Sequence, residues 1–130
     1  MEAGKTKPSP SPIIQAIRDA EHGSTGVIRV HLSKKWIETD PFRRAARIFN
    51  LHQMTRTSQR NAVLIYVNLR RRKFAIVGDL GLQKAIGQRD WEVLTKELEE
   101  NLRATQSEKA ISLAVTSVGE ILKKFFPAEP

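Results

Sequence analysis

Residues 60–82 read RNAVLIYVNLRRRKFAIVGDLGL, two short apolar runs separated by consecutive basic residues. The first run, 62–69, is almost entirely apolar, rich in β-branched residues and too short for a good helix, which predicts a strand buried on both faces. The second run, 74–77, has the same character. Because only residues 70–73 connect the two, and a parallel return needs a crossover of about a dozen residues or more, the runs predict an antiparallel hairpin.

The expected pairing within this hairpin determines which side chains meet at its open end. If Leu69 pairs with Phe74, then Asn61 lies across from Leu82. The residues expected to meet at this end of the sheet are Arg60, Asn61, Asp79 and Gly81.

The rest of the chain predicts four helices and one further strand. Capping residues followed by apolar positions at helical spacing mark the helix starts. These capping residues are Ser11, Asp40, Asp90 and Ser107. The alternating residues 27–32 predict a strand near a sheet edge, and residues 82–86 predict one helical turn. The predicted fold class is α/β: a small mixed β-sheet with an antiparallel central hairpin and helices on both faces, an α/β/α sandwich.

The domain organisation predicted from length is a single domain of ordinary size. Residues 1–10 alternate proline with serine and lysine, and such a composition buries too little apolar area to offset its chain entropy. A disordered tail is therefore predicted at residues 1–10, followed by one folded domain at residues 11–127.

Positive charge is concentrated in one part of the chain. The formal net charge is +8, and residues 29–73 hold twelve Lys and Arg against two Asp and Glu. This asymmetry has two interpretations, an anionic partner or a charged face that keeps the protein in solution. The basic residues 70–73 have few aromatic residues near them, which argues against a nucleic-acid partner without excluding one, because single-strand binders interleave charge with stacking aromatics.

Composition also bounds the chemistry and the setting of the protein. The chain has no cysteine, so disulfides, thiolate catalysis and cysteine-ligated zinc are excluded. No apolar run approaches the ~18 residues of a membrane span, and the first residues show no apolar signal region. A cytoplasmic location is expected.

Two motifs in and before the predicted hairpin match a known family. They are H-x-M-x-x-T-x-x-R-N-A-V-L-I-Y-V at residues 52–67 and F-A-I-V-G-D-x-G-L at residues 74–82. Thr25-Gly26 lies before the first predicted strand, and Trp91 follows the glycine-containing residues 78–81. Together with the two motifs, this order resembles the TPM-domain family, specifically its short, soluble bacterial members. The family is named after thylakoid-lumen phosphatase-like proteins, a photosystem-repair protein and an animal channel modulator. The resemblance covers about residues 12–127.

The resemblance implies a compact α/β/α domain with a carboxylate-lined groove, which is a divalent-cation (calcium) site in some members, and acid-phosphatase activity in a few. Longer members have Asp-Asn-Gly where this chain has Arg-Asn-Ala at residues 60–62. They have Gly-Leu-Glu where it has Gly-Leu-Gln at residues 81–83. Two expected carboxylates are therefore missing. Asp79 is retained, and the neighbouring Arg60 competes with a metal for it.

The candidate metal ligands are Asp79, Asn61 and Asp40. Calcium prefers six to eight oxygen ligands, which Asp79 would supply with Asn61 and backbone carbonyls. Asp40 joins them only if the strand at 27–32 runs parallel to residues 74–77. In the competing interpretation Asp79 is a turn residue paired with Arg60, and Asp40 is only a helix cap.

The candidate ligand-binding residues are Arg60, Thr57, Gly81 and Gln83. The loop 55–60 offers hydroxyl and guanidinium groups suited to a phosphate or a carboxylate, although it lacks the glycines of a phosphate cradle. The predicted function is a binding or interaction module with a groove at the end of the central hairpin that holds calcium weakly. The alternatives are a weak metal-dependent acid phosphatase acting on phosphate esters, and a binder of an anionic partner through the basic segment. The partner is an unknown protein or a small anionic ligand.

Overall fold

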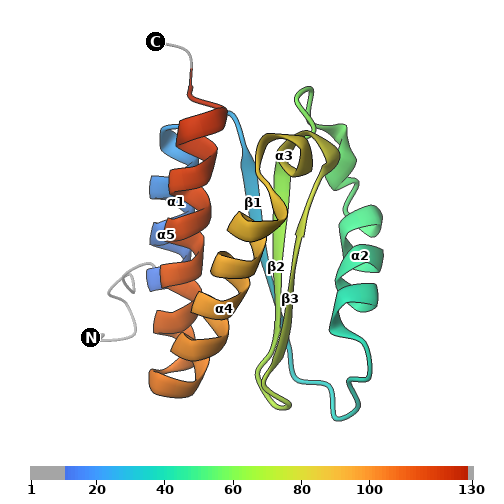
Figure 1. Ribbon diagram of the computed structural model, residues 1–130. Coiled ribbons are helices and arrows are strands. Elements are labelled where there is room, and N and C mark those ends of the chain that lie inside the picture. The colour runs from blue at the N-terminus through green and yellow to red at the C-terminus, as the bar shows by residue number, and fades with distance from the viewer. Residues whose placement is uncertain (1–10, 129–130) are drawn as a thin grey trace, which may run out of the picture.

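A three-stranded sheet forms the centre of the computed structural model, which describes residues 11–128 (Figure 1). The strands are β1 (Val27–Ser33), β2 (Ala62–Asn68) and β3 (Lys73–Gly78), in the order β1-β2-β3. β2 runs parallel to β1 and antiparallel to β3. The predicted mixed sheet with an antiparallel hairpin is confirmed. All of β2 is buried, as its apolar run indicates, because it has a strand on each side and helices over each face.

The predicted register of the hairpin is wrong by two residues. Phe74 pairs with Val67 and Lys73 pairs with Asn68. Asn68 starts the turn because its side-chain oxygen accepts hydrogen bonds from the backbone N–H groups of Arg70 and Arg71, both at 3.0 Å. Since side chains alternate with a period of two, a shift by two residues leaves every side chain on its expected face.

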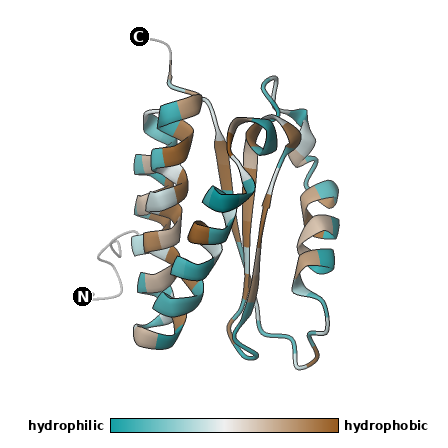
Figure 2. Ribbon diagram, in the orientation of Figure 1, coloured by the Kyte–Doolittle hydropathy of each residue, from teal (hydrophilic) through white to brown (hydrophobic). Residues whose placement is uncertain are grey.

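Helices cover both faces of the sheet, as predicted (Figure 1). On one face lie α1 (Pro12–His22), α4 (Gln88–Ala104) and α5 (Ser107–Phe125), and on the other lies α2 (Pro41–Leu51). The β2 residues that face the three-helix layer are Val63, Ile65 and Val67, and those that face α2 are Ala62, Leu64 and Tyr66. Figure 2 shows the hydrophobic colour gathered on the strands between these layers.

Two of the four predicted helix caps are confirmed. Ser11 accepts a hydrogen bond from the N–H of Ile14 at 3.1 Å, and Asp40 accepts one from the N–H of Arg43 at 3.0 Å. The other two caps are wrong by one to three residues.

The helix predicted to start after Asp90 is capped by Gly87 and begins at Gln88, because Asp90 is used instead as the acidic residue of the first turn. Ser107 is the first residue of α5 rather than its cap, a position taken by Gln106.

The helical turn predicted at residues 82–86 is present as the short helix α3 (Leu80–Ala85), which begins two residues earlier. The 3₁₀ turn η2 (Met54–Arg56) lies in the connection predicted as a loop. The predicted disordered tail at residues 1–10 lies outside the described residues. Within residues 11–128, no helix is both long and apolar enough to cross a membrane.

Candidate functional site

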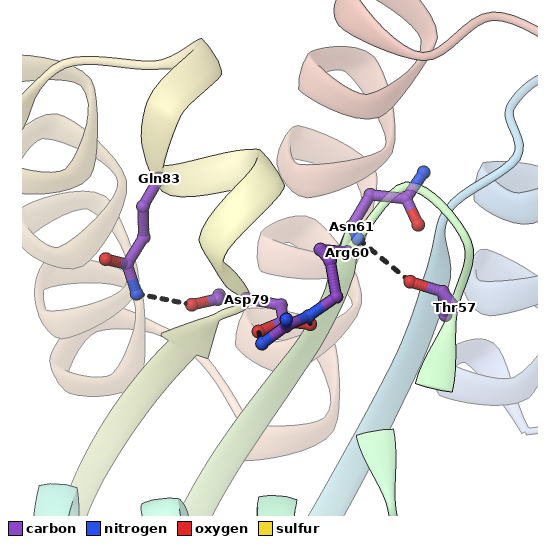
Figure 3. A network of polar contacts seen from close by, with 6 residues as sticks. Thr57, Arg60, Asn61, Asp79 and Gln83 are labelled. Atoms are coloured by element: carbon purple, nitrogen blue, oxygen red, sulfur yellow. Dashed lines mark hydrogen bonds and ion pairs between the residues drawn. The ribbon is translucent and has the colours of Figure 1, made fainter. Parts of the chain in front are cut away.

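An ion pair joins the chain segments at the open end of the hairpin, where β2 begins and β3 ends. Arg60 precedes β2 and Asp79 follows β3. The Arg60 Nε lies 2.6 Å from Asp79 Oδ2, and its Nη2 lies 2.9 Å from Oδ1 (Figure 3). This bidentate geometry is the strong form of a carboxylate–guanidinium pair and engages both carboxylate oxygens. The Asp79 side chain is 6% exposed and that of Arg60 is 45% exposed, so only the arginine faces water.

Backbone contacts fix the positions of both partners. Arg60 adopts a left-handed φ of 52°, and its carbonyl oxygen accepts a hydrogen bond from the N–H of Gly81 at 2.8 Å. A Cβ at Gly81 would lie only 2.0 Å from the carbonyl oxygen of Gln59, so no larger residue fits this approach. The N–H of Asp79 donates to the carbonyl of Ala62 at 2.9 Å. The turn after β3 is therefore docked onto the loop before β2.

The other predicted ligand-binding residues, Thr57 and Gln83, are engaged in local hydrogen bonds. Thr57 Oγ1 accepts from the backbone N–H of Asn61 at 3.0 Å, which orders the loop before β2. Gln83 Nε2 donates to the carbonyl oxygen of Gly78 at 2.7 Å. Arg60, Asp79 and Gly81 converge as expected, whereas the side chains of Thr57 and Gln83 do not contact the ion pair.

The Asn61 side chain points away from Asp79 (Figure 3). Its Nδ2 donates to Thr25 Oγ1 at 2.9 Å and to Gln59 Oε1 at 3.3 Å. Asn61 is buried, and its Oδ1 has no hydrogen-bond partner among the described residues. This amide links the loops before β1 and β2, and the structure does not place it beside Asp79.

Asp40 lies at the opposite end of the sheet from Asp79. Because β1 is parallel to β2 and antiparallel to β3, residues that follow β1 lie near the start of β3, not its end. The parallel arrangement of β1 and β3 on which a role for Asp40 depended is therefore absent. Between residues 11 and 128, no three His, Asp or Glu side chains gather in a way that would hold a metal ion. The three predicted metal ligands are not brought together, and with both Asp79 oxygens on Arg60 the residues do not fit a resident calcium ion.

Glu38 also follows the first strand, and like Asp40 it was expected near Asp79 only if that strand ran parallel to residues 74–77. It belongs instead to a buried polar group at the other end of the hairpin, which the sequence did not predict. Glu38, 7% exposed, accepts hydrogen bonds on Oε1 from the Tyr66 hydroxyl and, at 2.9 Å, from Asn68 Nδ2. Lys73 Nζ donates to the Glu38 carbonyl at 2.8 Å. The available signal was the presence of Tyr66 and Asn68, two polar groups inside a run buried on both faces, since buried polar groups require partners.

The charge states in this group follow from its contacts. Burial by itself would raise the pKa of Glu38, but the hydrogen bonds from Tyr66 and Asn68 and the positive charge of Arg44 outweigh it, so the pKa is lowered. Burial and the bond to the Glu38 carboxylate raise the pKa of Tyr66. The pair is an ionised acceptor and a neutral donor, and it anchors the β1–α2 connection to the central strand.

His31 stacks on the Tyr66 ring with centroids 5.7 Å apart. Burial lowers the pKa of His31, and so does the positive charge of Arg44, His52 and Arg29. The imidazole is therefore kept neutral on this face of the sheet.

A groove of about 580 Å³ runs along β3, from Asp40 and Phe42 at one end to Gly78 and Gln83 at the other. Its remaining wall comes from Trp91 and other residues of α3 and α4. Neither Arg60 nor Asp79 is among the residues that line it. The groove is thus adjacent to the ion pair but separate from it.

Comparison with known proteins identifies the family and the fold. The model of the TPM domain matches residues 7–121. The chain belongs to the TPM-domain family. It is similar to the BA42 protein of the psychrophilic bacterium Bizionia argentinensis, with 30% identity, a TM-score of 0.83, and 99% of this chain and 90% of that chain covered.

A second solved structure shows the same fold at lower identity. The N-terminal domain of the cg2496 protein from Corynebacterium glutamicum is 16% identical, with a TM-score of 0.68 over 92% of this chain and 76% of that one. Among curated proteins, none matches this chain significantly.

Proposed function

We propose that this TPM-domain chain is a cytoplasmic binding module that acts without a tightly bound calcium ion and without catalysis. The observation that carries the proposal is the bidentate contact between Arg60 and Asp79, which uses both oxygens of the carboxylate expected to hold a metal. For calcium to bind at Asp79, Arg60 would have to move away. The ion would then have a single carboxylate ligand, whereas tight calcium sites have several. Affinity for calcium is expected to be in the millimolar range or absent.

Calorimetric titration with CaCl₂ tests the proposal on the wild type and on the double variant Arg60→Asp/Gln83→Glu. The variant restores two carboxylates, and because ligand charge tunes affinity for a hard cation, its calcium affinity should rise by tenfold or more. Gln15→Glu/Arg18→Asp makes the same charge changes on the exposed face of α1 and should leave calcium binding unchanged. Micromolar binding by the wild type that survives in the double variant would show that calcium is held elsewhere.

The enzymatic alternative is a weak metal-dependent phosphatase, tested by turnover of a chromogenic phosphate ester across pH with and without Ca²⁺ or Mg²⁺. We expect no metal-stimulated turnover. The binding-module proposal would be contradicted by metal-dependent turnover that disappears in Asp79→Ala and persists in Asp90→Ala. The protein would then be a phosphatase. Asp90 is a suitable control because it is exposed and lies in the first turn of α4.

An anionic partner is the second candidate function, favoured by the exposure of Arg43 and Arg47 on α2 and of Arg71 and Arg72 on the hairpin turn. Binding of this kind weakens as salt screens the charges. A partner whose affinity does not fall between 50 and 300 mM NaCl, a span of about twofold in screening length, would not be held by these arginines.

A further inference from the structure

β3 is an edge strand whose outer peptide groups face the groove. In an antiparallel pair, opposed residues alternate between those that exchange hydrogen bonds and those that turn their N–H and C=O outward. The bond from Asp79 N–H to the Ala62 carbonyl, in the register 62 with 79, fixes this alternation. The outward residues of β3 are therefore Phe74, Ile76 and Gly78, and all three line the groove.

One of these outward peptide groups, the carbonyl of Gly78, already has a hydrogen-bond partner. The Gly78 carbonyl accepts from Gln83 Nε2 at 2.7 Å, so a side chain occupies the position of a neighbouring strand. Among the described residues, no side chain or loop backbone donates to or accepts from the peptide groups of Phe74 and Ile76. The N–H and C=O groups of these two residues are therefore available to pair with another strand along the groove.

The walls limit what can reach this edge. Figure 1 shows β3 running between α2 and α4, and the lining residues Phe42 and Trp91 come from these two helices. Phe42 is 58% exposed and therefore presents an accessible apolar surface at the wall of the groove. Because the groove has residues of α2 on one side and of α4 on the other, we expect its edge to accept a single extended segment more readily than the edge of a second folded sheet.

Charged residues near the groove favour one orientation of a bound extended segment relative to β3. Arg71 and Arg72 are exposed on the turn that precedes Phe74, whereas Arg70 stacks over the Trp36 ring at 3.7 Å and is already engaged. Asp40, the charged residue among the groove lining, lies at this same end and caps α2 through Oδ1, but with Arg71 and Arg72 the formal charge there stays positive. A segment antiparallel to β3 ends beside the turn, so acidic residues at its C-terminal end would meet Arg71 and Arg72.

We infer that the groove along β3 binds an extended segment of a partner protein that adds as an antiparallel fourth strand, with apolar side chains between Phe42 and Trp91 and acidic residues at its C-terminal end. Adding a strand to an exposed sheet edge is a general mode of peptide recognition, in which backbone hydrogen bonds supply affinity and alternate side chains supply specificity. The inference rests on the proposed binding-module function and names its partner class. Its failure can be told apart from that of the calcium test, because the peptide is tested on the chain with Gln83 intact and without calcium.

Amide hydrogen exchange with a probe peptide tests the inference. The probe is an N-acetylated hexapeptide, Thr-Val-Thr-Val-Asp-Glu, with a free C-terminal carboxylate. In the free protein, the amides of Ala75 and Val77 should be protected by β2, while those of Phe74 and Ile76 should exchange quickly. Saturating peptide should slow exchange at Phe74 and Ile76 by about tenfold or more, because they become hydrogen-bonded. No change at these two amides with millimolar peptide would overturn the inference.

Methylating the backbone nitrogens of the probe separates strand pairing from simple apolar contact. Two isomers are compared, one N-methylated at its odd residues and one at its even residues. Only one set of amides faces β3, so one isomer should lose binding by tenfold or more while the other keeps it. Equal loss in both isomers would contradict strand addition, and this test changes nothing in the protein.

Two controls address charge and self-association. Arg71→Glu/Arg72→Glu should weaken the probe about tenfold at low salt, whereas Arg18→Glu/Lys109→Glu, on α1 and α5, should not. Equal affinity in the two variants would overturn the assigned direction. Protection of Phe74 and Ile76 that rises with protein concentration in the absence of peptide would make the occupant a second copy of the chain and overturn the partner assignment.

Discussion

The two polar groups at the ends of the hairpin contrast in their access to water. The pair Arg60–Asp79 closes one end with an arginine that is nearly half exposed, whereas Glu38 closes the other end as a buried carboxylate held by Tyr66 and Asn68. An exposed partner can exchange with solvent ions, while a buried acceptor cannot leave without exposing unpaired donors. The two carboxylates are equally buried, so the ends differ in the partner of the carboxylate: an arginine that reaches water at the first end, and two buried neutral donors at the second.

Glu38→Ala should produce the largest loss of stability, because it leaves the Tyr66 hydroxyl and the Asn68 amide buried without their acceptor. The expected decrease in the free energy of unfolding is about 3 kcal/mol, measured by urea denaturation. Glu38→Gln keeps an acceptor oxygen and should lose less than half as much. Equal losses in the two variants would mean that the hydrogen bonds at this end contribute little.

Gly81→Ala should destabilise the exposed end by about 2 kcal/mol, since the new Cβ would collide with the backbone oxygen of Gln59. Gly87→Ala is the matched control. A Cβ at Gly87 meets nothing within 4 Å, so in thermal unfolding this variant should lose only the N-cap preference for glycine over alanine, less than half of the loss at Gly81. If both variants melt alike, the docking of the turn onto the loop is not tight.

Arg60→Ala should cost less than either change above, because loss of the 45%-exposed guanidinium lets water reach the Asp79 carboxylate, which is only 6% exposed while the pair is intact. Thermal unfolding at low and high salt is the measurement, and the deficit should shrink as salt rises. Arg56→Ala, an exposed arginine of the same loop, provides the comparison. A deficit larger than that of Glu38→Ala would reverse the contrast between the two ends.

The smallest expected effect is a pH dependence near neutrality from His31. Its pKa is lowered on folding, so the folded state binds fewer protons than the unfolded chain near the ordinary value of 6.5. The stability from neutral His31 is present above 6.5 and is lost as pH falls through the lowered pKa. His31→Phe keeps the stacking on Tyr66 and should flatten this slope in urea midpoints measured from pH 8 to pH 5. An unchanged slope would place the titrating group elsewhere, and His22→Gln controls for an exposed histidine.

The strands and the two-sided burial were predictable because they follow from residue type and period alone. The convergence of Arg60 and Asp79 followed from the hairpin and survived the error in register, because the true pairing brings residue 79 opposite residue 62. The register itself depended on one side chain, Asn68, whose oxygen starts the turn. A hydrogen bond from the backbone to a side chain competes with the hydrogen bonds between strands, and the pattern of apolar residues gives no sign of it.

Other features lay beyond the sequence because they depend on tertiary placement. At the start of β2, the Asn61 side chain could point toward Asp79 or away from it. It points away because its amide donates to Thr25, which is distant in the sequence. Glu38 lies in an irregular connection without periodicity, so its burial could be seen only once Tyr66 had been placed. The end of the sheet reached by Asp40 was set by the parallel pairing of β1 with β2.

The placement of the two tryptophans gives the molecule a pair of built-in optical reporters. Trp36 is 70% exposed beside the hairpin turn, and Trp91 lines the groove. A soluble quencher such as acrylamide should therefore reduce the emission of Trp36 before that of Trp91. In Trp36→Phe the remaining signal reports on the groove alone, so occupancy of that surface can be followed by emission wavelength without attaching a dye.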